Sequence, residues 1–382
     1  MATSVKRGDM YMKSLTKKWL ALAAAGLMLA GGIAGCGGEK QAASQGESAE
    51  ITVTDIKGNE VKVPKDLKKI AVTPIPWASV TYFMDGNSER LAAIHPAAMT
   101  AFKNSFIAKH DKNFANIDTK IVNSNFSINA EAAANAGIQA AVMWQYQDKD
   151  AEKLKQIGIA PVLIYNDNIE DLKKSFTILG KMLGKEDRAQ KINAYYDNVY
   201  KDITSHKAEV DAAEKPTILF LRTSKLRLQG NDNFVHQELE IGGAHNTMDQ
   251  VALDSNNKSI SMEQVYDINP DVIFLSNFDT FVPDDLYENK IPGQDWSTVK
   301  AVQNHRVYKV PLGVYRWDAP GVETPLMMEW VAHTLQPKIF GYLDVRKDTK
   351  AFYKDMLNID VTDEDLAQIF QDNANKNSQP IF

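Results

Sequence analysis

The chain is poor in cysteine and lacks a marked excess of either charge. Among its 382 residues there is one cysteine, Cys36, and the formal net charge is −6. A single cysteine excludes an internal disulfide, a cysteine-based metal cluster and a CxxC redox pair. Because no large basic excess is present, nucleic acid is not expected as a partner.

Common catalytic and metal-binding motifs are also missing. The sequence contains no GxSxG turn, no glycine loop of the phosphate-binding type and no HExxH pair. The 7 histidines have no HxxxH spacing, whereas a protein that binds a bare metal ion needs several converging ligands. We therefore expect neither an enzyme, nor a resident cofactor, nor a direct metal site.

A hydrophobic run of export-signal length occurs only at the N-terminus. Lys13, Lys17 and Lys18 precede "WLALAAAGLMLAGGIAGC", which is too short and too rich in glycine to span a membrane well. This pattern predicts a signal peptide over residues 1–36, with Met12 as an alternative start. Its end, "IAGC", resembles a bacterial lipobox, so Cys36 is expected to carry lipid.

The polar segment 37–50 then predicts a flexible tether between the lipid and the folded domain. The protein is accordingly expected to be exported and anchored to the bacterial cell membrane, facing the periplasm or the outer surface.

The remaining chain predicts an α/β fold. Residues 51–64 alternate apolar and polar side chains around a turn, as in a β-hairpin. Short apolar runs then alternate with helix-like segments, which favours a mostly parallel sheet covered on both faces. The alternation stops near residue 169 and resumes after Pro216.

Between these regions, residues 185–210 contain neither proline nor glycine and place apolar side chains at helical spacing. We therefore predict two open, mostly parallel-sheet lobes joined by one long α-helix, with a ligand cleft between the lobes. The expected boundaries are an N-terminal lobe at 51–180, a connecting helix at 181–213, and a C-terminal lobe with closing helices at 214–382.

One sequence unit occurs twice. "SINAEAAANAGIQAAVMW", beginning at Ser127, has an altered copy, "SISMEQVYDINPDVIFLS", beginning at Ser259. In this alignment Glu131 corresponds to Glu263, and each glutamate opens a helix-like segment that leads into a strand-like run. A glutamate in a first helical turn is favoured by the helix dipole, but that role alone does not require the repetition.

Ligands of open α/β sheets bind beyond the carboxyl ends of the strands. Residues near the predicted strand ends are therefore candidates for the ligand site. They are mainly aromatic, cationic or polar: Trp77, His95, Asn125, Trp144, Tyr146, Arg227, Phe278, Tyr315, Arg316 and Trp317. Flat aromatic faces suit planar or catecholate ligands, and arginine suits carboxylates and anionic metal chelates.

Four stretches resemble a known family. They are "TDIKGNEVKVP", "NFVHQELEIGGAHN", "ISMEQVYDINPDVIFL" and "WSTVKAVQNHRVYKVP". Together they are similar to the class III substrate-binding proteins of ABC importers for iron–siderophores, haem and corrinoids. The resemblance implies a monomer that captures a small-molecule metal chelate and delivers it to a permease dimer with its ATPase subunits. It also implies that Glu131 and Glu263 dock to arginines of the permease.

The ligand stays open at this point. A ferric siderophore ranks first and a corrinoid or haem second. A likeness to a molybdate- or tungstate-binding branch makes an oxyanion the third choice, with Ser124, Asn125 and Ser127 as donors. A surface lipoprotein without a transport role is the alternative of a different class.

Overall fold

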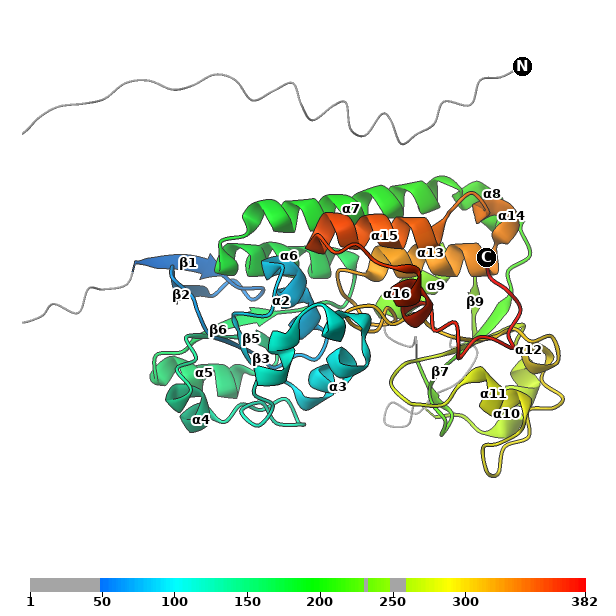
Figure 1. The fold of residues 1–382 in the computed structure, drawn as a ribbon, viewed down its shortest axis with the longest axis horizontal. Coiled ribbons are helices and arrows are strands. Elements are labelled where there is room, and N and C mark those ends of the chain that lie inside the picture. The colour runs from blue at the N-terminus through cyan, green and yellow to red at the C-terminus, as the bar shows by residue number, and fades with distance from the viewer. Residues whose placement is uncertain (1–48, 230–232, 248–258) are drawn as a thin grey trace, which may run out of the picture. The chain divides into compact units, whose positions relative to one another are not determined.

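A computed structural model describes residues 49–229, 233–247 and 259–382 (Figure 1). The predicted signal peptide, Cys36 and the tether up to residue 48 lie outside the described residues. Within the described part of the chain, no helix is long and apolar enough to cross a membrane.

The described chain begins with the expected hairpin. Strands β1 (Glu50–Thr54) and β2 (Glu60–Pro64) pair antiparallel. The Asp55 carboxylate closes the turn by accepting hydrogen bonds from the backbone N–H groups of Lys57 and Asn59, each at 2.9 Å. Gly58 has a φ of 84°, a conformation that favours glycine.

A parallel sheet follows the hairpin. Its strands are β3 (Ile70–Val72), β4 (Leu91–Ile94), β5 (Ala140–Trp144) and β6 (Ala160–Ile164), in the order β4-β3-β5-β6. Most of their side chains are buried, because helices cover both faces of such a sheet. The helices of this region are α2 (Trp77–Asp85), α3 (Pro96–Asn104), η1 (Phe106–Lys109), η2 (Lys112–Asn116), α4 (Ala130–Asn135), α5 (Asp148–Gln156) and α6 (Ile169–Leu183).

The connecting segment is not the single helix that the sequence predicted over 181–213. Helix α6 ends at Leu183 and is followed by Gly184, which has a φ of 65°. Helix α7 (Glu186–Ser205) ends before His206, and the short α8 (Lys207–Ala212) follows. Ile203 and Val210 are both buried, so the apolar pattern continues across the break at His206. The sequence pattern therefore gave no sign of the break.

A second sheet lies beyond α8. Its strands are β7 (Thr217–Thr223), β8 (Arg227–Leu228), β9 (His245–Asn246), β10 (Val272–Leu275) and β11 (Val307–Lys309). The order is β11-β10-β7 with β9 on the other side of β7, and β8 adds an antiparallel edge. The order β9-β7-β10-β11 therefore repeats the order β4-β3-β5-β6. The predicted α/β class with two mostly parallel sheets is confirmed.

Helices surround and close this second region. They are α9 (Asn233–Ile241), α10 (Met262–Ile268), α11 (Pro283–Tyr287), α12 (Lys300–Gln303), α13 (Thr324–Leu335), α14 (Pro337–Phe340), α15 (Val345–Leu357) and α16 (Asp363–Ile369).

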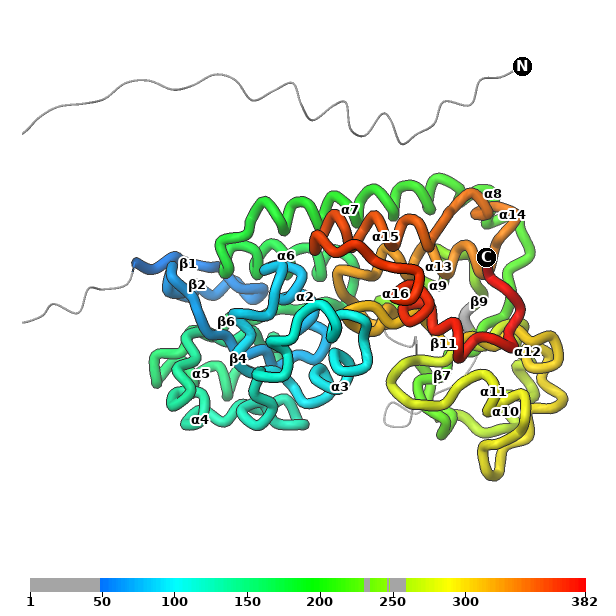
Figure 2. The backbone as a smooth tube through the Cα atoms, viewed as in Figure 1, coloured from blue at the N-terminus to red at the C-terminus, as the bar shows by residue number. Residues whose placement is uncertain are grey.

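Helix α15 runs back toward the first sheet and lies close to α7 (Figure 2). The ring of Phe352 on α15 lies 5.6 Å from Phe83 on α2 and 5.2 Å from Tyr195 on α7. One apolar cluster includes residues of both sheets and of these helices. The two sheets are therefore connected by the packing of α13 and α15 as well as by α7.

Candidate functional site

A cavity of about 300 Å³ lies at the carboxyl ends of strands from both sheets. This is the position at which open α/β sheets bind ligands. The residues that line it come from both sheets: Ile75, Pro76, Phe126, Trp144, Tyr146, Asn166, Asp167, Arg222, Gln229, Phe234, Phe278, Tyr315, Arg316, Asp318, Ala319 and Pro320.

Aromatic residues dominate the wall from the first sheet, which we call the N-terminal wall (Phe126, Trp144 and Tyr146). The rings of Trp144 and Tyr146 stack with centroids 6.1 Å apart and planes at 19°. Tyr146 is 65% exposed, so its face is available to a ligand. Trp144 is the last residue of β5, which places its ring directly at the edge of the sheet.

A largely buried side chain, Gln147, holds this wall in position. Its Oε1 accepts hydrogen bonds from the Trp144 backbone N–H at 2.9 Å and from the Thr73 hydroxyl at 2.6 Å. Its side-chain amide donates to the Phe126 carbonyl at 2.7 Å. One glutamine therefore links the ends of β3 and β5 to the loop that carries Phe126.

Two arginines and a phenylalanine form the opposite wall, which we call the C-terminal wall (Arg222, Phe278 and Arg316). The guanidinium carbons of Arg222 and Arg316 lie 3.5 and 3.9 Å from the centre of the Phe278 ring. Such contacts stabilise a cation over an aromatic face. Both arginines thus reach the cavity beside one shared ring.

Hydrogen bonds fix the two guanidinium groups. Arg316 donates to the Ser276 hydroxyl at 2.9 Å and to Asp318 Oδ2 at 3.0 Å. Arg222 donates to Gln229 Oε1 at 2.8 Å. Burial, followed by the charge of Arg316, lowers the pKa of Arg222 to about 10, so Arg222 is still charged at neutral pH. On the C-terminal side the described lining holds two cations, Arg222 and Arg316, and the carboxylate of Asp318, while Asp167 adds a carboxylate from the N-terminal side. An anionic ligand that contacts both guanidinium groups would relieve the repulsion between them.

A buried lysine supports the loop that presents Phe278. The Lys309 ammonium donates to the carbonyls of Ser276, Asp279 and Phe281 at 2.9, 2.7 and 2.9 Å. Burial lowers the pKa of Lys309 to about 8. Lys309 thus satisfies three backbone acceptors around Phe278 without lining the cavity itself.

Five of the ten residues proposed from the sequence line this cavity: Trp144, Tyr146, Phe278, Tyr315 and Arg316. For two others, Trp77 and Trp317, the expectation was wrong because both side chains are fully buried. Trp77 donates to Asn166 Oδ1 at 3.3 Å, and so supports the cavity from behind. Trp317 packs against Phe370 in the core, with ring centroids 5.5 Å apart.

The other three proposed residues, His95, Asn125 and Arg227, also lie away from the lining. His95 is buried, caps α3 by accepting from the Ala97 N–H at 3.0 Å, and has a pKa that burial lowers. Asn125 is exposed in its loop and accepts from the Ser127 hydroxyl. Arg227 is exposed on the edge strand β8.

The sequence reasoning missed Arg222, Gln229 and the pair Asn166–Asp167. Arg222 was overlooked because it lies inside the strand "TILFLRT" and not after it. An arginine within an otherwise apolar strand was the available signal, since a charged side chain in such a run needs a partner.

The two repeated glutamates occupy equivalent places. Glu131 and Glu263 are both exposed in the first turns of α4 and α10. Helix α4 leads into β5, which pairs with β3, and α10 leads into β10, which pairs with β7. A hydrogen bond from the Ser261 side chain lowers the pKa of Glu263. The repeated sequence unit is therefore also a repeated structural unit.

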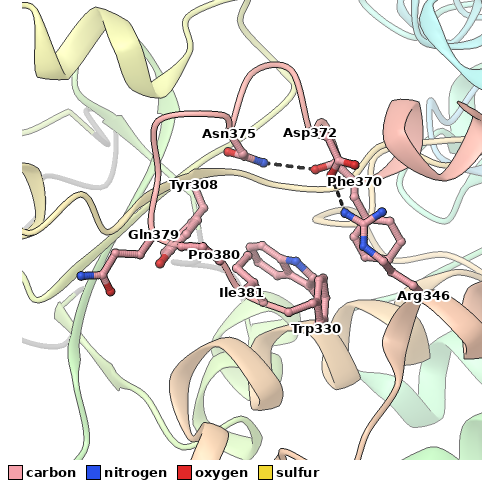
Figure 3. Close-up of a pocket in the computed structure, with 10 residues that line it drawn as sticks. Tyr308, Trp330, Arg346, Phe370, Asp372, Asn375, Gln379, Pro380 and Ile381 are labelled. Carbon is pink, nitrogen blue, oxygen red and sulfur yellow. Dashed lines mark hydrogen bonds and ion pairs between the residues drawn. The ribbon is translucent and has the colours of Figure 1, made fainter. Parts of the chain in front are cut away.

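A second cavity, of about 220 Å³, lies beside the C-terminal segment (Figure 3). Trp330, Tyr308 and Phe370 line it, and Arg346 donates to Asp372 Oδ1 at 2.5 Å at its side. All of its lining residues follow β10 in the chain, so the first sheet contributes none of them. Within residues 49–229, 233–247 and 259–382, no three His, Cys, Asp or Glu side chains gather closely enough to hold a metal ion.

Known proteins resemble both the sequence and the fold. Residues 140–312 match the family described as "Periplasmic binding protein". A periplasmic solute binding protein from Veillonella parvula is 36% identical, with a TM-score of 0.81 over 87% of this chain and 100% of that one.

Two proteins of Bacillus subtilis are more distant. The uncharacterized ABC transporter substrate-binding lipoprotein YvrC is 24% identical over 78% of this chain and 90% of its own length. The Fe(3+)-citrate-binding protein YfmC is 25% identical over 59% of this chain and 74% of its own. The chain therefore belongs to the periplasmic binding protein family and is a substrate-binding protein of the ABC transporter type.

Proposed function

We propose that the protein captures an anionic metal chelate, with a ferric siderophore as the first choice, and delivers it to the permease of an ABC importer. The observation that carries this proposal is the pairing of the two walls. Arg222 and Arg316 face the cavity from one sheet, and the stacked Trp144 and Tyr146 face it from the other. Arginine binds carboxylate and other anionic oxygen groups, while the aromatic rings suit the flat faces of a chelate.

The size of the cavity and one relative support the same class of ligand. A volume of about 300 Å³ is at the lower end of the range for small-molecule sites, which runs from roughly 300 to 1,000 Å³. This volume favours a small ferric chelate over a large siderophore as well as over a corrinoid or haem. The B. subtilis relative named for Fe(3+)-citrate has a ligand of this kind.

The oxyanion alternative has less support. Its expected donors, Ser124, Asn125 and Ser127, are absent from the described lining of the cavity. Corrinoid or haem stays the second choice. A surface lipoprotein without a transport role is the alternative of a different class, and the cavity with its two arginines and stacked aromatic rings counts against it.

Glu131 and Glu263 complete the transport proposal as docking residues. Both are exposed, and they occupy equivalent positions in the two repeated units. Two like docking points suit a permease made of two subunits, because each unit can present its carboxylate to one subunit. Arginines on the permease would supply the opposite charge.

We propose further that Cys36 carries the lipid that holds the protein at the membrane. The support is the "IAGC" sequence after the hydrophobic run and the name of the lipoprotein relative. Lipid labelling of the wild type and of Cys36→Ser in a bacterial host tests this. Label retained by the variant would contradict it.

Calorimetric titration of the purified protein tests the ligand class. The probes are ferric citrate, a ferric catecholate, a ferric hydroxamate, haemin, cobalamin and molybdate. We expect the anionic ferric chelates to bind most tightly. Preferential binding of haemin or cobalamin would favour the second choice, and binding of molybdate alone would overturn the proposal.

A further inference from the structure

The loop that brings Tyr315 and Arg316 to the cavity is held by a buried carboxylate. Glu323, immediately before α13, is 4% exposed. Its Oε1 accepts from the Val314 N–H at 2.7 Å, and its Oε2 accepts from the Tyr315 N–H at 3.0 Å. Because these two amides are fixed, the backbone from which the Arg316 side chain leaves is fixed as well.

A tyrosine from another helix holds this carboxylate. The hydroxyl of Tyr353, on α15, donates to Glu323 Oε1, the same oxygen that accepts from Val314. Tyr353 is fully buried. A Cβ atom at Gly313 would overlap Glu323 and Tyr353 and would lie 2.6 Å from Trp317 Nε1. The loop, the carboxylate and the hydroxyl therefore fit together without spare room.

The ring of Tyr353 packs against residues that belong to the first sheet's side of the molecule. Its centroid lies 4.8 Å from Phe106 in an edge-to-face contact and 6.3 Å from Phe83 in a stacked contact. The ring is thus seated among N-terminal residues, while the hydroxyl bonds to a group that supports the C-terminal wall.

We infer that Tyr353 is a positioning residue for the ligand site, which acts through Glu323 on the backbone of residues 314–316. The inference rests on the proposed function in one respect, which is that the cavity is the ligand site. The reason is geometric: a displacement of the first sheet's helices relative to the second sheet moves Tyr353 and with it the Glu323 carboxylate. The position of Arg316 is then coupled to the relative placement of the two sheets.

The surroundings of Glu323 make this link sensitive to pH. Tyr353 faces it from α15 and Trp317 from the loop. Burial raises the pKa of Tyr196 on α7, and the charges of Glu238 and Glu323 add to that rise. Burial raises the pKa of Glu323 to about 7, against the opposing effect of its hydrogen bonds. Protonation below that pH weakens the carboxyl as an acceptor for the two loop amides, so acid should loosen the loop.

Hydrogen exchange of the full-length protein without ligand tests the link directly. In Tyr353→Phe, the amides of Val314 and Tyr315 should exchange about tenfold faster than in the wild type, as expected for the loss of one hydrogen bond to a charged group. Amides of β7 should be unchanged. Tyr342→Phe is the matched control, because it removes a tyrosine–carboxylate hydrogen bond to Asp202, 2.7 Å long, away from the cavity.

A second variant and a pH series distinguish positioning from a general loss of stability. After correction for intrinsic rates, wild-type protection of these two amides should fall below about pH 7, and in Glu323→Gln it should no longer depend on pH. The inference is overturned if Tyr353→Phe exchanges like Tyr342→Phe at residues 314 and 315, or if protection in Glu323→Gln follows pH as in the wild type.

Ferric citrate titrations complete the test. Tyr353→Phe should bind this probe several-fold more weakly than Tyr342→Phe. If the wild type binds no ferric citrate, the proposed ligand class is wrong for this probe, yet the exchange result still decides the role of Tyr353. Unchanged affinity in Tyr353→Phe with faster exchange would contradict the effect on the ligand site.

Discussion

The guanidinium carbon of Arg222 lies 3.5 Å from the centre of the Phe278 ring, and Arg316 contacts the same ring at 3.9 Å. One half-exposed phenylalanine thus stabilises two like charges at the edge of the cavity. Burial, and after it the charge of Arg316, lowers the pKa of Arg222. The two like charges repel each other without an anion, and a bound anion would offset that repulsion.

Arg222→Gln should weaken binding of an anionic ferric chelate by roughly tenfold to a hundredfold, the usual effect of losing a hydrogen bond to a charged group. Arg227→Gln is the control, because Arg227 is close in sequence but exposed and outside the lining. Calorimetry measures both. Equal losses in the two variants would mean that general charge attraction, and not this cavity, binds the ligand.

Trp144→Ala should weaken ligand binding by about 1–3 kcal/mol, the scale for an aromatic contact at a binding site. Its effect on the free energy of unfolding should be smaller, because Trp144 is only partly buried. Trp317→Ala should affect stability more than ligand binding. It should lower the free energy of unfolding by about 3–5 kcal/mol, since Trp317 is a fully buried core residue. Urea unfolding and calorimetry on both variants separate the two roles.

Lys309 should make the protein more stable as pH rises from about 8 to 10.5, the range between its folded and its unfolded pKa. The folded pKa is the lower one, so the unfolded chain binds more protons in this window and deprotonation favours the fold. The gain should reach about 2–3 kcal/mol. Buried tyrosines with raised pKa values act in the opposite direction near pH 10, so the increment is the difference between the wild type and Lys309→Met in urea unfolding at pH 7.5 and 10. An equal change of stability with pH in the two proteins would refute this role.

Glu131→Ala and Glu263→Ala should each lower transport in membranes that contain the permease, while ligand affinity stays almost unchanged. Charge reversal at either position should be more harmful, because it places like charges together at the interface. Reversal of Glu152, an exposed acid on α5 of the first lobe, is a suitable control. Wild-type transport by the doubly substituted Glu131→Lys, Glu263→Lys protein would rule out docking by these residues.

Ligand binding should be accompanied by only a small rotation of the lobes. One reason is the helical connection between the lobes, which runs through α7 and α8 with a break at His206. The packing of Phe352 on Phe83 and Tyr195 supplies another, because a large rotation would have to separate buried aromatic rings. Small-angle X-ray scattering with and without ligand should give nearly equal radii of gyration. A clear decrease on binding would contradict the prediction.

Local patterns in the sequence were sufficient for the architecture. Strand-like runs that alternate with helix-like segments predicted two α/β regions, because this alternation is interrupted between residues 169 and 216. The repeated unit predicted equivalent helices at Glu131 and Glu263. These features depend on neighbouring residues, so they can be read without knowing what packs against them. The same holds for the expectation that Trp144, Tyr146 and Phe278 follow strands and reach the sheet edge.

The direction of individual side chains depended on the tertiary structure. Arg316 lines the cavity, whereas its neighbour Trp317 is buried against Phe370, and the sequence assigned both to the site. The role of Tyr353 also required the fold, because its partners Phe106 and Glu323 lie far away in the chain. Sequence periodicity shows which residues share a face of one element, but which face meets the ligand is decided by contacts with elements distant in sequence.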